Sequence, residues 1–246
     1  MKKIIFSLLA VLIFGNINAQ KLSRKQYGAL LVKKLQLSKK FGDLQAYRSS
    51  LYDLIAWEGE QSAYLDTLAD FYYANKEWIP FVLLNGERLK RHPEHRDYLY
   101  MQAVAWEQLG NLKEAVTYYE KVYAQNPDDA KTGFQLAWSQ YQLKRLDETY
   151  RTLMGLKDKK FPENVYVKIP GIKNKIIDVP LKAAYFNLLG LVTYDLHNLD
   201  LAVKYFDEAL KIYPDFELAR QNKAALELMK QKLESSGADK ENKEKK

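Results

Sequence analysis

A large apolar residue recurs in this chain at a fixed distance of 34 positions, at Leu44, Trp78, Leu112 and Leu146. Four members at constant spacing make coincidence an unsatisfactory explanation. A fifth, similar segment contains Leu199, which follows Leu146 by 53 positions and is therefore 19 positions out of phase. A period of this length is typical of a chain built from short stacked units, and it predicts one interruption before the last unit.

Proline positions follow the same period and indicate what each unit contains. Pro93 and Pro127 are 34 positions apart, Pro162 follows after 35, and Pro214 closes the late unit. Proline ends a helix because it lacks an amide donor and clashes with the preceding turn. We therefore expect two helices with a bend between them in each of the units 28–61, 62–95, 96–129, 130–163 and 183–216.

The third unit shows how such helices could pack. Leu99, Ala103 and Trp106 recur at helical spacing in its first half, and Ala115 and Tyr119 do so in its second half. Small alanines allow two helices to approach, and large aromatic residues fill gaps in the neighbouring unit. Each pair leaves one apolar face uncovered, so stacking of neighbours completes the core. The sequence predicts an all-α fold.

These residues resemble the tetratricopeptide repeat family. The resemblance is carried in the last unit by Leu189, Gly190, Ala202, Phe206, Ala209 and Pro214, and in the third unit by Ala103, Trp106, Gly110, Ala115, Tyr119 and Pro127. Other units depart from the pattern, since Phe81 and Thr149 stand where the family usually has alanine. The resemblance implies a right-handed α-α superhelical stack whose inner, concave groove binds proteins or peptides.

Family positions transferred to this chain imply which side chains would line the groove. The expected partner-binding residues are Tyr73, Tyr100, Gln108, Lys131, Phe134, Trp138, Tyr141, Gln142, Asn187 and Tyr194. Aromatic anchors within a polar rim are what peptide-binding surfaces use. Trp138 and its aromatic neighbours could equally be core residues. Only Lys131 matches the lysine and asparagine clamp with which some family members bind chaperone tails, so that activity is not implied.

The segment 164–182 interrupts the repeats with a different periodicity. Val165, Val167 and Ile169 alternate with other residues, and Ile176 and Ile177 follow a Pro-Gly pair. We expect an extended insertion, with a hairpin turn near 173–175 and with Asp178 and Pro180 beginning the next helix. The insertion could be an arm that contacts a partner, or a connector that lies against the stack.

The C-terminal residues divide into a helix and a polar tail. We expect a capping helix at 217–234 with Ala225, Leu228 and Met229 facing inward and its lysines facing outward. The tail 235–246 is polar enough to be disordered.

The N-terminal residues have the order of a secretory signal. Lys2 and Lys3 precede an apolar run from Ile4 to Phe14, and Ala19 follows a short polar segment. We expect cleavage after Ala19 and an exported mature chain, periplasmic or secreted, without a transmembrane segment. The chain has no cysteine, so a lipid-anchored product is not expected and the mature protein should be soluble. Loss of both lysines lowers the formal charge from +7 to +5, which is weak support for nucleic-acid binding.

Signals of catalysis are sparse. His92 and His95 flank Pro93 at a turn between units with only Glu94 nearby, whereas a metal site needs three or four converging ligands. We found no phosphate-binding loop and no nucleophile motif, and we predict no catalytic residue, metal or cofactor. The favoured function is a non-catalytic scaffold or adaptor of the cell envelope that binds a protein or peptide. A chaperone or carrier for exported polypeptides, and an envelope enzyme with a helical repeat body, are the alternatives.

Overall fold

The computed structural model describes residues 22–59, 61–171 and 175–244, and it describes the side chains of the last helix up to residue 232. The expected signal segment 1–19 lies outside these residues. The chain divides into two compact units, Met1–Phe71 and Tyr72–Lys246, and each unit is considered by itself.

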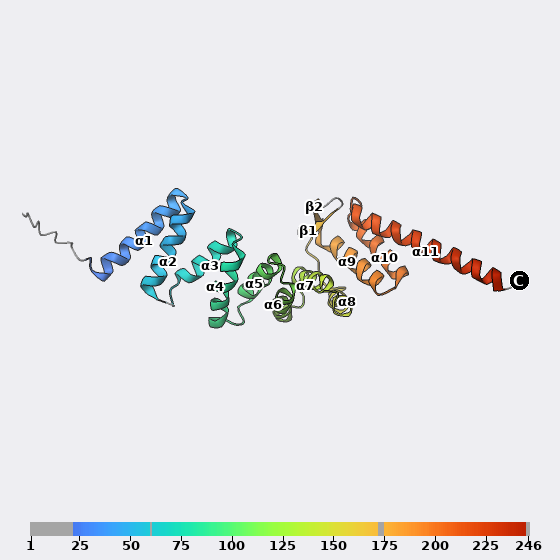
Figure 1. The fold of residues 1–246 in the computed structure, drawn as a ribbon, viewed down its shortest axis with the longest axis horizontal. Helices are drawn as coiled ribbons and strands as arrows, with labels where there is room; N and C mark the ends of the chain where they lie inside the picture. Colours follow the sequence, from blue (N-terminus) through green and yellow to red (C-terminus); the bar gives the residue numbers. More distant parts are fainter. Residues whose placement is uncertain (1–21, 60, 172–174, 245–246) are drawn as a thin grey trace, which may run out of the picture. The chain divides into compact units, whose positions relative to one another are not determined.

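Helices arranged in consecutive pairs make up most of the described chain (Figure 1). The first unit contains α1 (Arg24–Phe41), α2 (Leu44–Glu58) and most of α3 (Tyr64–Ala74). The second unit contains the end of α3, then α4 (Trp78–Arg91), α5 (Arg96–Gln108), α6 (Leu112–Gln125), α7 (Ala130–Gln142), α8 (Leu146–Gly155), α9 (Leu181–Asp195), α10 (Leu199–Ile212) and α11 (Glu217–Glu244), with strands β1 (Tyr166–Pro170) and β2 (Ile176–Pro180) before α9. The all-α repeat fold expected from the sequence is confirmed, with one small two-stranded sheet.

The repeating Leu/Trp column marks one position in every pair, the first residue of the second helix. Leu44, Trp78, Leu112, Leu146 and Leu199 begin α2, α4, α6, α8 and α10. Two residues earlier, the backbone is left-handed each time, at Gly42, Lys76, Gly110, Lys144 and His197. A left-handed residue ends the first helix and redirects the chain into the second. The period in the sequence therefore reflects a recurring turn between the two helices of each pair. Glycine occupies the left-handed position in only two of these five turns.

Replacing Lys76 with glycine is expected to raise the free energy of unfolding by about 0.5–1 kcal/mol. Lys76 has φ = 58°, where a Cβ atom crowds the backbone and glycine does not. Lys204→Gly, within α10, should lower the free energy of unfolding by about 1 kcal/mol because glycine disfavours helix interiors. Urea unfolding of both variants tests the turn, and equal losses in the two would contradict it.

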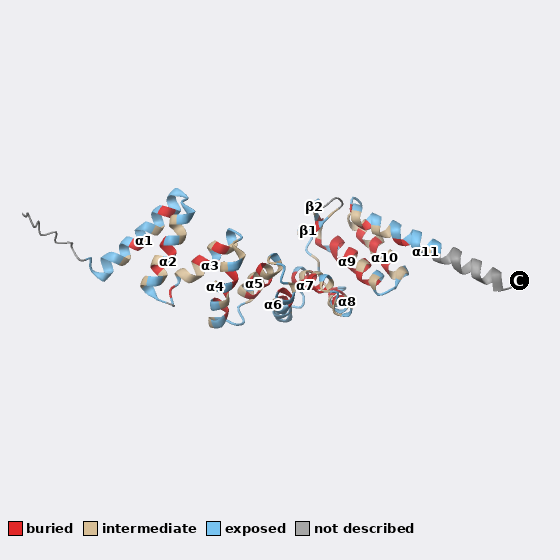
Figure 2. Ribbon diagram, in the orientation of Figure 1, coloured by how far each residue is buried: buried red, intermediate tan, exposed pale blue. Residues whose placement is uncertain are grey.

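The core of the second unit is a series of clusters between successive helices. Buried residues such as Leu99 and Val122 join α5 and α6, and a larger cluster extends from α7 through α11 and includes the two strands. Figure 2 shows buried residues along the faces where paired helices meet. This distribution is what stacking of repeats predicts, because each pair covers the apolar face of the next.

Two glycines, Gly133 and Gly190, allow side chains of the paired helical segments to pack directly on the backbone. A Cβ atom placed on Gly190 would lie 2.5 Å from Cε1 of Phe206, so the phenyl ring of α10 lies directly against the backbone of α9. Gly133 of α7 is covered in the same way by Leu156, whose Cδ2 would be 2.7 Å from an added Cβ. Packing at this density leaves no room for a methyl group.

The insertion forms an antiparallel hairpin that lies against the stack. Its register pairs Lys168 with Asp178, and the buried side chains of Ile169 and Val179 belong to the large core cluster. Leu181 N donates to Val165 O at 2.8 Å, so the hairpin leads directly into α9. The side of the hairpin that contains Ile169 and Val179 therefore lies against the stack, which is what a connector would do. The expected turn falls largely on 172–174, outside the described residues.

Two details of the insertion differ from expectation. Asp178 belongs to β2 and does not begin a helix; Pro180 takes the N-cap position of α9 instead. The helix therefore includes Leu181 and Lys182, which we had assigned to the insertion 164–182. Leu181 is fully buried, which explains why the helix begins where core packing begins.

The last helix corrects the expected capping face. Phe216, Ala219 and Leu226 are buried, whereas Leu228 and Met229 are largely exposed. The lysines do not all face outward, because Lys223 and Lys230 form ion pairs with Asp207 and Asp200 of α10. The face of α11 that contacts α10 therefore includes Lys223 and Lys230. This face is rotated about the helix axis from the face that hydrophobicity alone predicted.

The expected boundary between this helix and a disordered tail is also wrong. α11 continues to Glu244, ten residues beyond the predicted end at 234 and through most of 235–246. Four of the ten residues from 235 to 244 are glutamate or lysine and one is alanine, all of which have high helix propensity. A polar composition therefore did not exclude a helix.

Candidate functional site

The first helices of the repeats bring several of the predicted groove residues together. Between α5 and α7, the Tyr100 hydroxyl donates to Oε1 of Gln135 at 2.9 Å. The ammonium group of Lys131 lies 5.5 Å from the centre of the Tyr100 ring, within the range of a cation–π interaction. These contacts fix the orientation of Tyr100 relative to α7.

Aromatic side chains continue along α7 towards α9. The ring centre of Trp138 lies 6.3 Å from that of Tyr141. The Lys144 ammonium lies 5.1 Å from the Tyr141 ring centre and 3.3 Å from Oδ2 of Asp195 at the end of α9. Burial raises the pKa of Tyr141, and Asp195 and Tyr194 raise it further.

At the other end, Tyr73 closes the series from the last turn of α3. Its ring centre lies 5.5 Å from that of Trp78 and 5.0 Å from that of Phe81. Burial raises the pKa of the Tyr73 hydroxyl, and Tyr100 adds to this effect.

We name this set the aromatic strip, and its members are Tyr73, Tyr100, Trp138, Tyr141 and Tyr194. Each of these side chains is partly accessible to solvent, and successive members come from α3, α5, α7 and α9 of the second unit. Among the other predicted residues, Lys131 is exposed beside the strip, and Gln108 and Gln142 are exposed as the last residues of α5 and α7.

Two predicted groove residues are core residues instead. Phe134 is only 5% exposed and Asn187 only 2% exposed, so neither offers a side chain to a ligand at an open surface. Phe134 supports the strip from below, since its ring is stacked on that of Trp138 at 6.5 Å. Trp138 is half-buried and packs against the core cluster, so it combines the two roles that its sequence position left open.

Sequence reasoning missed two polar members of this surface. Gln135 lies four residues after Lys131 and three before Trp138, so helical spacing could have found it. Lys144 lies in the turn after α7, where the left-handed backbone directs it towards Asp195. No periodicity signal predicts a contact made by a turn residue.

A small recess adjoins the C-terminal end of the strip. It has a volume of about 170 Å³ and is lined by Leu191 and Tyr194 of α9 and by Ala225 and Met229 of α11, among others. The short side chain of Ala225 leaves this space open. Tyr194 belongs to both the strip and the recess, so a ligand on the strip could place an apolar side chain there.

One carboxyl group beneath the strip has an altered ionisation. Burial raises the pKa of Glu107, while a hydrogen bond from the Tyr119 hydroxyl at 2.7 Å opposes this shift. Burial and proximity to Glu107 also raise the pKa of Tyr119. The pair joins α5 to α6 within one repeat, which is a structural role.

Within the described ranges, no group of three or more His, Asp or Glu side chains is placed to hold a metal ion. The helices of the same residues include none that is both long enough and apolar enough to cross a membrane.

Family comparison identifies the repeats. Two models described as tetratricopeptide repeat match residues 88–130 and 183–216, and the second match has the bounds of the last predicted unit. The chain therefore contains tetratricopeptide repeats. Repeats of this kind generally form non-catalytic scaffolds, and they imply a protein or peptide as the partner. No curated protein matches the sequence.

Solved structures share the fold of this chain at low sequence identity. YrrB, a TPR protein with an unusual peptide-binding site, is 17% identical with a TM-score of 0.60, over 79% of this chain and 90% of YrrB. A tetratricopeptide repeat protein from Parabacteroides merdae is 16% identical with a TM-score of 0.58, over 88% of this chain and 78% of that one. MamA from Desulfovibrio magneticus, residue 41 to the end, is 16% identical with a TM-score of 0.55, over 77% and 97% of the two chains.

Proposed function

We propose that this protein is a non-catalytic scaffold of the cell envelope that binds an extended segment of a partner protein along the aromatic strip. The observation that carries the proposal is the continuity of partly exposed aromatic side chains on α3, α5, α7 and α9. Rigid aromatic rings provide large contact areas at a small cost in side-chain entropy, which is why they dominate peptide-binding surfaces. YrrB, which shares the fold, has a peptide-binding site.

The polar groups of the strip suit a polypeptide ligand. Gln135 and Lys131 lie beside Tyr100, and the Lys144–Asp195 ion pair lies beside Tyr141. Amide and charged groups at these places can bond to the backbone amides and carbonyls of an extended chain. Rings between them can cover its apolar side chains, and the recess beside Tyr194 can hold one such side chain.

The proposed location in the envelope rests on the N-terminal sequence. A fusion of residues 1–24 to alkaline phosphatase, which is active only after export, is expected to be active. The matched fusion lacking Ile4–Phe14 should be inactive, because the apolar core of the signal is missing. Equal activity of both fusions would contradict export.

Alanine at both Trp138 and Tyr141 is expected to abolish capture of partner proteins from an envelope fraction. The two rings form the centre of the strip, where contacts contribute most to binding. The matched control replaces Ile79 and Leu83 of α4, which are 64% and 69% exposed, by alanine. Recovery of the same proteins with parent, control and Trp138/Tyr141 variant would reject the strip as the binding surface.

A further inference from the structure

Helix α1 of the first unit exposes an apolar stripe with the spacing of a helix–helix seam. Tyr27, Leu30, Leu37 and Phe41 are 43%, 52%, 43% and 74% exposed. With Lys34 included, the positions 27, 30, 34, 37 and 41 follow one another at alternating steps of three and four residues. We name these five residues the α1 seam. Such spacing keeps side chains in line along a helix and is the pattern that a partner helix packs against.

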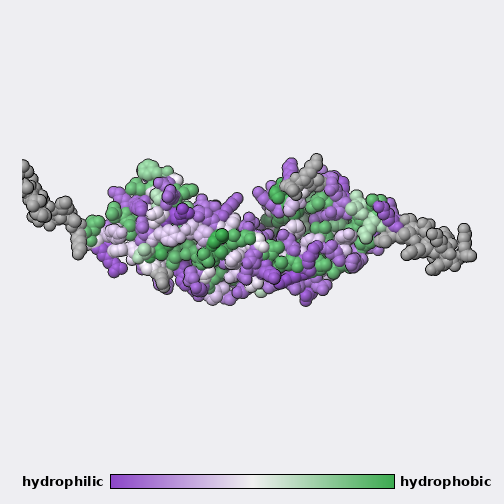
Figure 3. All heavy atoms as spheres, in the orientation of Figure 1, coloured by the Kyte–Doolittle hydropathy of each residue, from purple (hydrophilic) through white to green (hydrophobic). Residues whose placement is uncertain are grey.

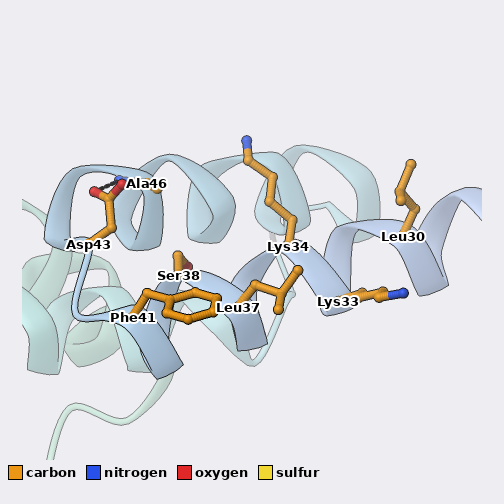
Figure 4. Close-up of a pocket in the computed structure, with 8 residues that line it drawn as sticks. All are labelled: Leu30, Lys33, Lys34, Leu37, Ser38, Phe41, Asp43 and Ala46. Carbon is orange, nitrogen blue, oxygen red and sulfur yellow. Dashed lines mark hydrogen bonds between the residues drawn. The ribbon is translucent and has the colours of Figure 1, made fainter.

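A recess accompanies the seam where α1 meets the start of α2 (Figure 4). Its volume is about 430 Å³, and Leu30, Leu37 and Phe41 lie along it with Asp43 and Ala46 at the end. Figure 3 shows apolar side chains at the surface over α1 and α2. The Asp43 carboxylate accepts from Ala46 N at 2.9 Å and so caps α2. A hollow of this kind admits side chains that project from a partner.

The charge around the seam has one sign. Between residues 24 and 41, α1 contains the basic residues Arg24, Lys25, Lys33, Lys34, Lys39 and Lys40, and no acidic residue. Lys34 is paired with Asp53 of α2 at 2.8 Å. Lys33 and Lys40 are exposed and precede Lys34 and Phe41 of the seam in the sequence, and Lys33 also lines the recess. A partner with acidic side chains at the matching positions would complement them.

We propose that the α1 seam binds an amphipathic helix of a partner protein in which acidic residues flank an apolar stripe. A second copy of this chain using the same face would bring together two helices that each have six basic residues and no acidic residue, which is electrostatically unfavourable. Basic residues beside apolar ones would also suit an anionic membrane surface, so the experiments below include vesicles. The recess favours a partner helix, because side chains that project from a helix can enter it. The seam lies in the first unit and the aromatic strip in the second, so this proposal does not depend on the proposed function.

The test uses a synthetic amphipathic helix of about 15 residues, a length that matches the roughly 21 Å between the ends of the seam. The acidic peptide has leucine at steps of three and four with glutamate on both flanks, and the control peptide has lysine in place of each glutamate. Fluorescence anisotropy with the purified protein is expected to show at least tenfold tighter binding of the acidic peptide. Added salt should reduce this difference, because exposed charges are screened.

Two sets of variants separate apolar from charged contributions. Leu37→Ser with Phe41→Ser should weaken binding of the acidic peptide at least tenfold. Lys33→Glu with Lys40→Glu should shift the preference towards the basic peptide. This pair changes only exposed charges, so it still tests the proposal if Leu37→Ser with Phe41→Ser impairs folding. Lys157→Glu with Lys204→Glu, in the second unit, makes the same change in net charge and should have no effect.

Several results would overturn the proposal. Equal binding of the acidic and basic peptides would do so, and so would acidic-peptide binding that is unchanged by Leu37→Ser with Phe41→Ser. Binding to phosphatidylglycerol vesicles without binding to the acidic peptide would assign the seam to a membrane. Self-association in sedimentation that Leu37→Ser abolishes would assign it to a second copy.

Discussion

Replacing Phe206 with alanine is expected to lower the free energy of unfolding by about 3–5 kcal/mol, the usual cost of removing a buried phenyl ring. Phe206 is 1% exposed, and its ring lies against the backbone of α9 at Gly190. Because the ring fills the space between the two helices, its loss leaves a cavity that the surrounding side chains can fill only in part. Urea unfolding should be followed by both circular dichroism and tryptophan fluorescence, since repeat proteins can unfold in parts.

The control for this prediction is Leu83→Ala on α4. Leu83 is 69% exposed, so its loss should change the free energy of unfolding by less than about 0.5 kcal/mol. Equal losses for the two variants would show that the interface between α9 and α10 is not packed as described.

Gly190→Ala examines the same contact from α9. In the parent protein it should be destabilising, although alanine is favoured over glycine by about 1 kcal/mol within a helix, because the methyl group would meet the Phe206 ring. In the Phe206→Ala background the same methyl group enters the cavity, so Gly190→Ala should be stabilising. A change of sign is the signature of direct contact between two residues.

Ala225→Phe is expected to weaken binding of a partner peptide roughly thirtyfold, which corresponds to about 2 kcal/mol and to the loss of one anchoring side chain. Ala225 lines the recess beside Tyr194, and a phenyl ring there would occupy the space of about 170 Å³ that an apolar side chain of the ligand would otherwise enter. The substitution is on the accessible surface of α11, so stability should change by less than about 1 kcal/mol.

Ala224→Phe is the matched control, since Ala224 is also exposed on α11 but does not line the recess. The ligand is a peptide from a protein captured by the parent chain, and the dissociation constants are measured by calorimetry. Equal affinities of the Ala224 and Ala225 variants would show that the recess is not used. That result would not contradict the aromatic strip as the binding surface, because the Trp138 and Tyr141 variants test that proposal separately.

The family pattern and the burial of each side chain together explain which site residues could be predicted from the sequence. Tyr100, Trp138, Tyr141 and Tyr194 were predicted as groove residues because the family pattern assigns one face of each first helix to the groove, and the structure leaves their side chains partly accessible. Phe134 and Asn187 occupy equivalent positions but are buried. Their accessibility depends on how closely neighbouring helices approach, which one helix's own sequence does not contain.

The contacts of turn residues and the inward face of the last helix were predicted less well, because they too depend on contacts between different helices. The column beginning at Leu44 fixed the start of each second helix, yet Lys144 was missed because its contact with Asp195 joins residues 51 positions apart. The capping face of α11 was shifted because Lys223 and Lys230 meet acidic residues of α10. In both cases a charged side chain forms an ion pair with a residue of another helix.

The sequence by itself determined the repeat period, the helical pairs and the place of the single interruption, because these depend on local turn geometry and helical spacing that recur along the chain. Only the tertiary structure decided which aromatic residues are accessible, where the recess between α9 and α11 lies, and that the inserted hairpin packs on the stack. These features depend on distances between helices, and those distances are fixed by contacts such as Phe206 against Gly190, made between residues of different helices.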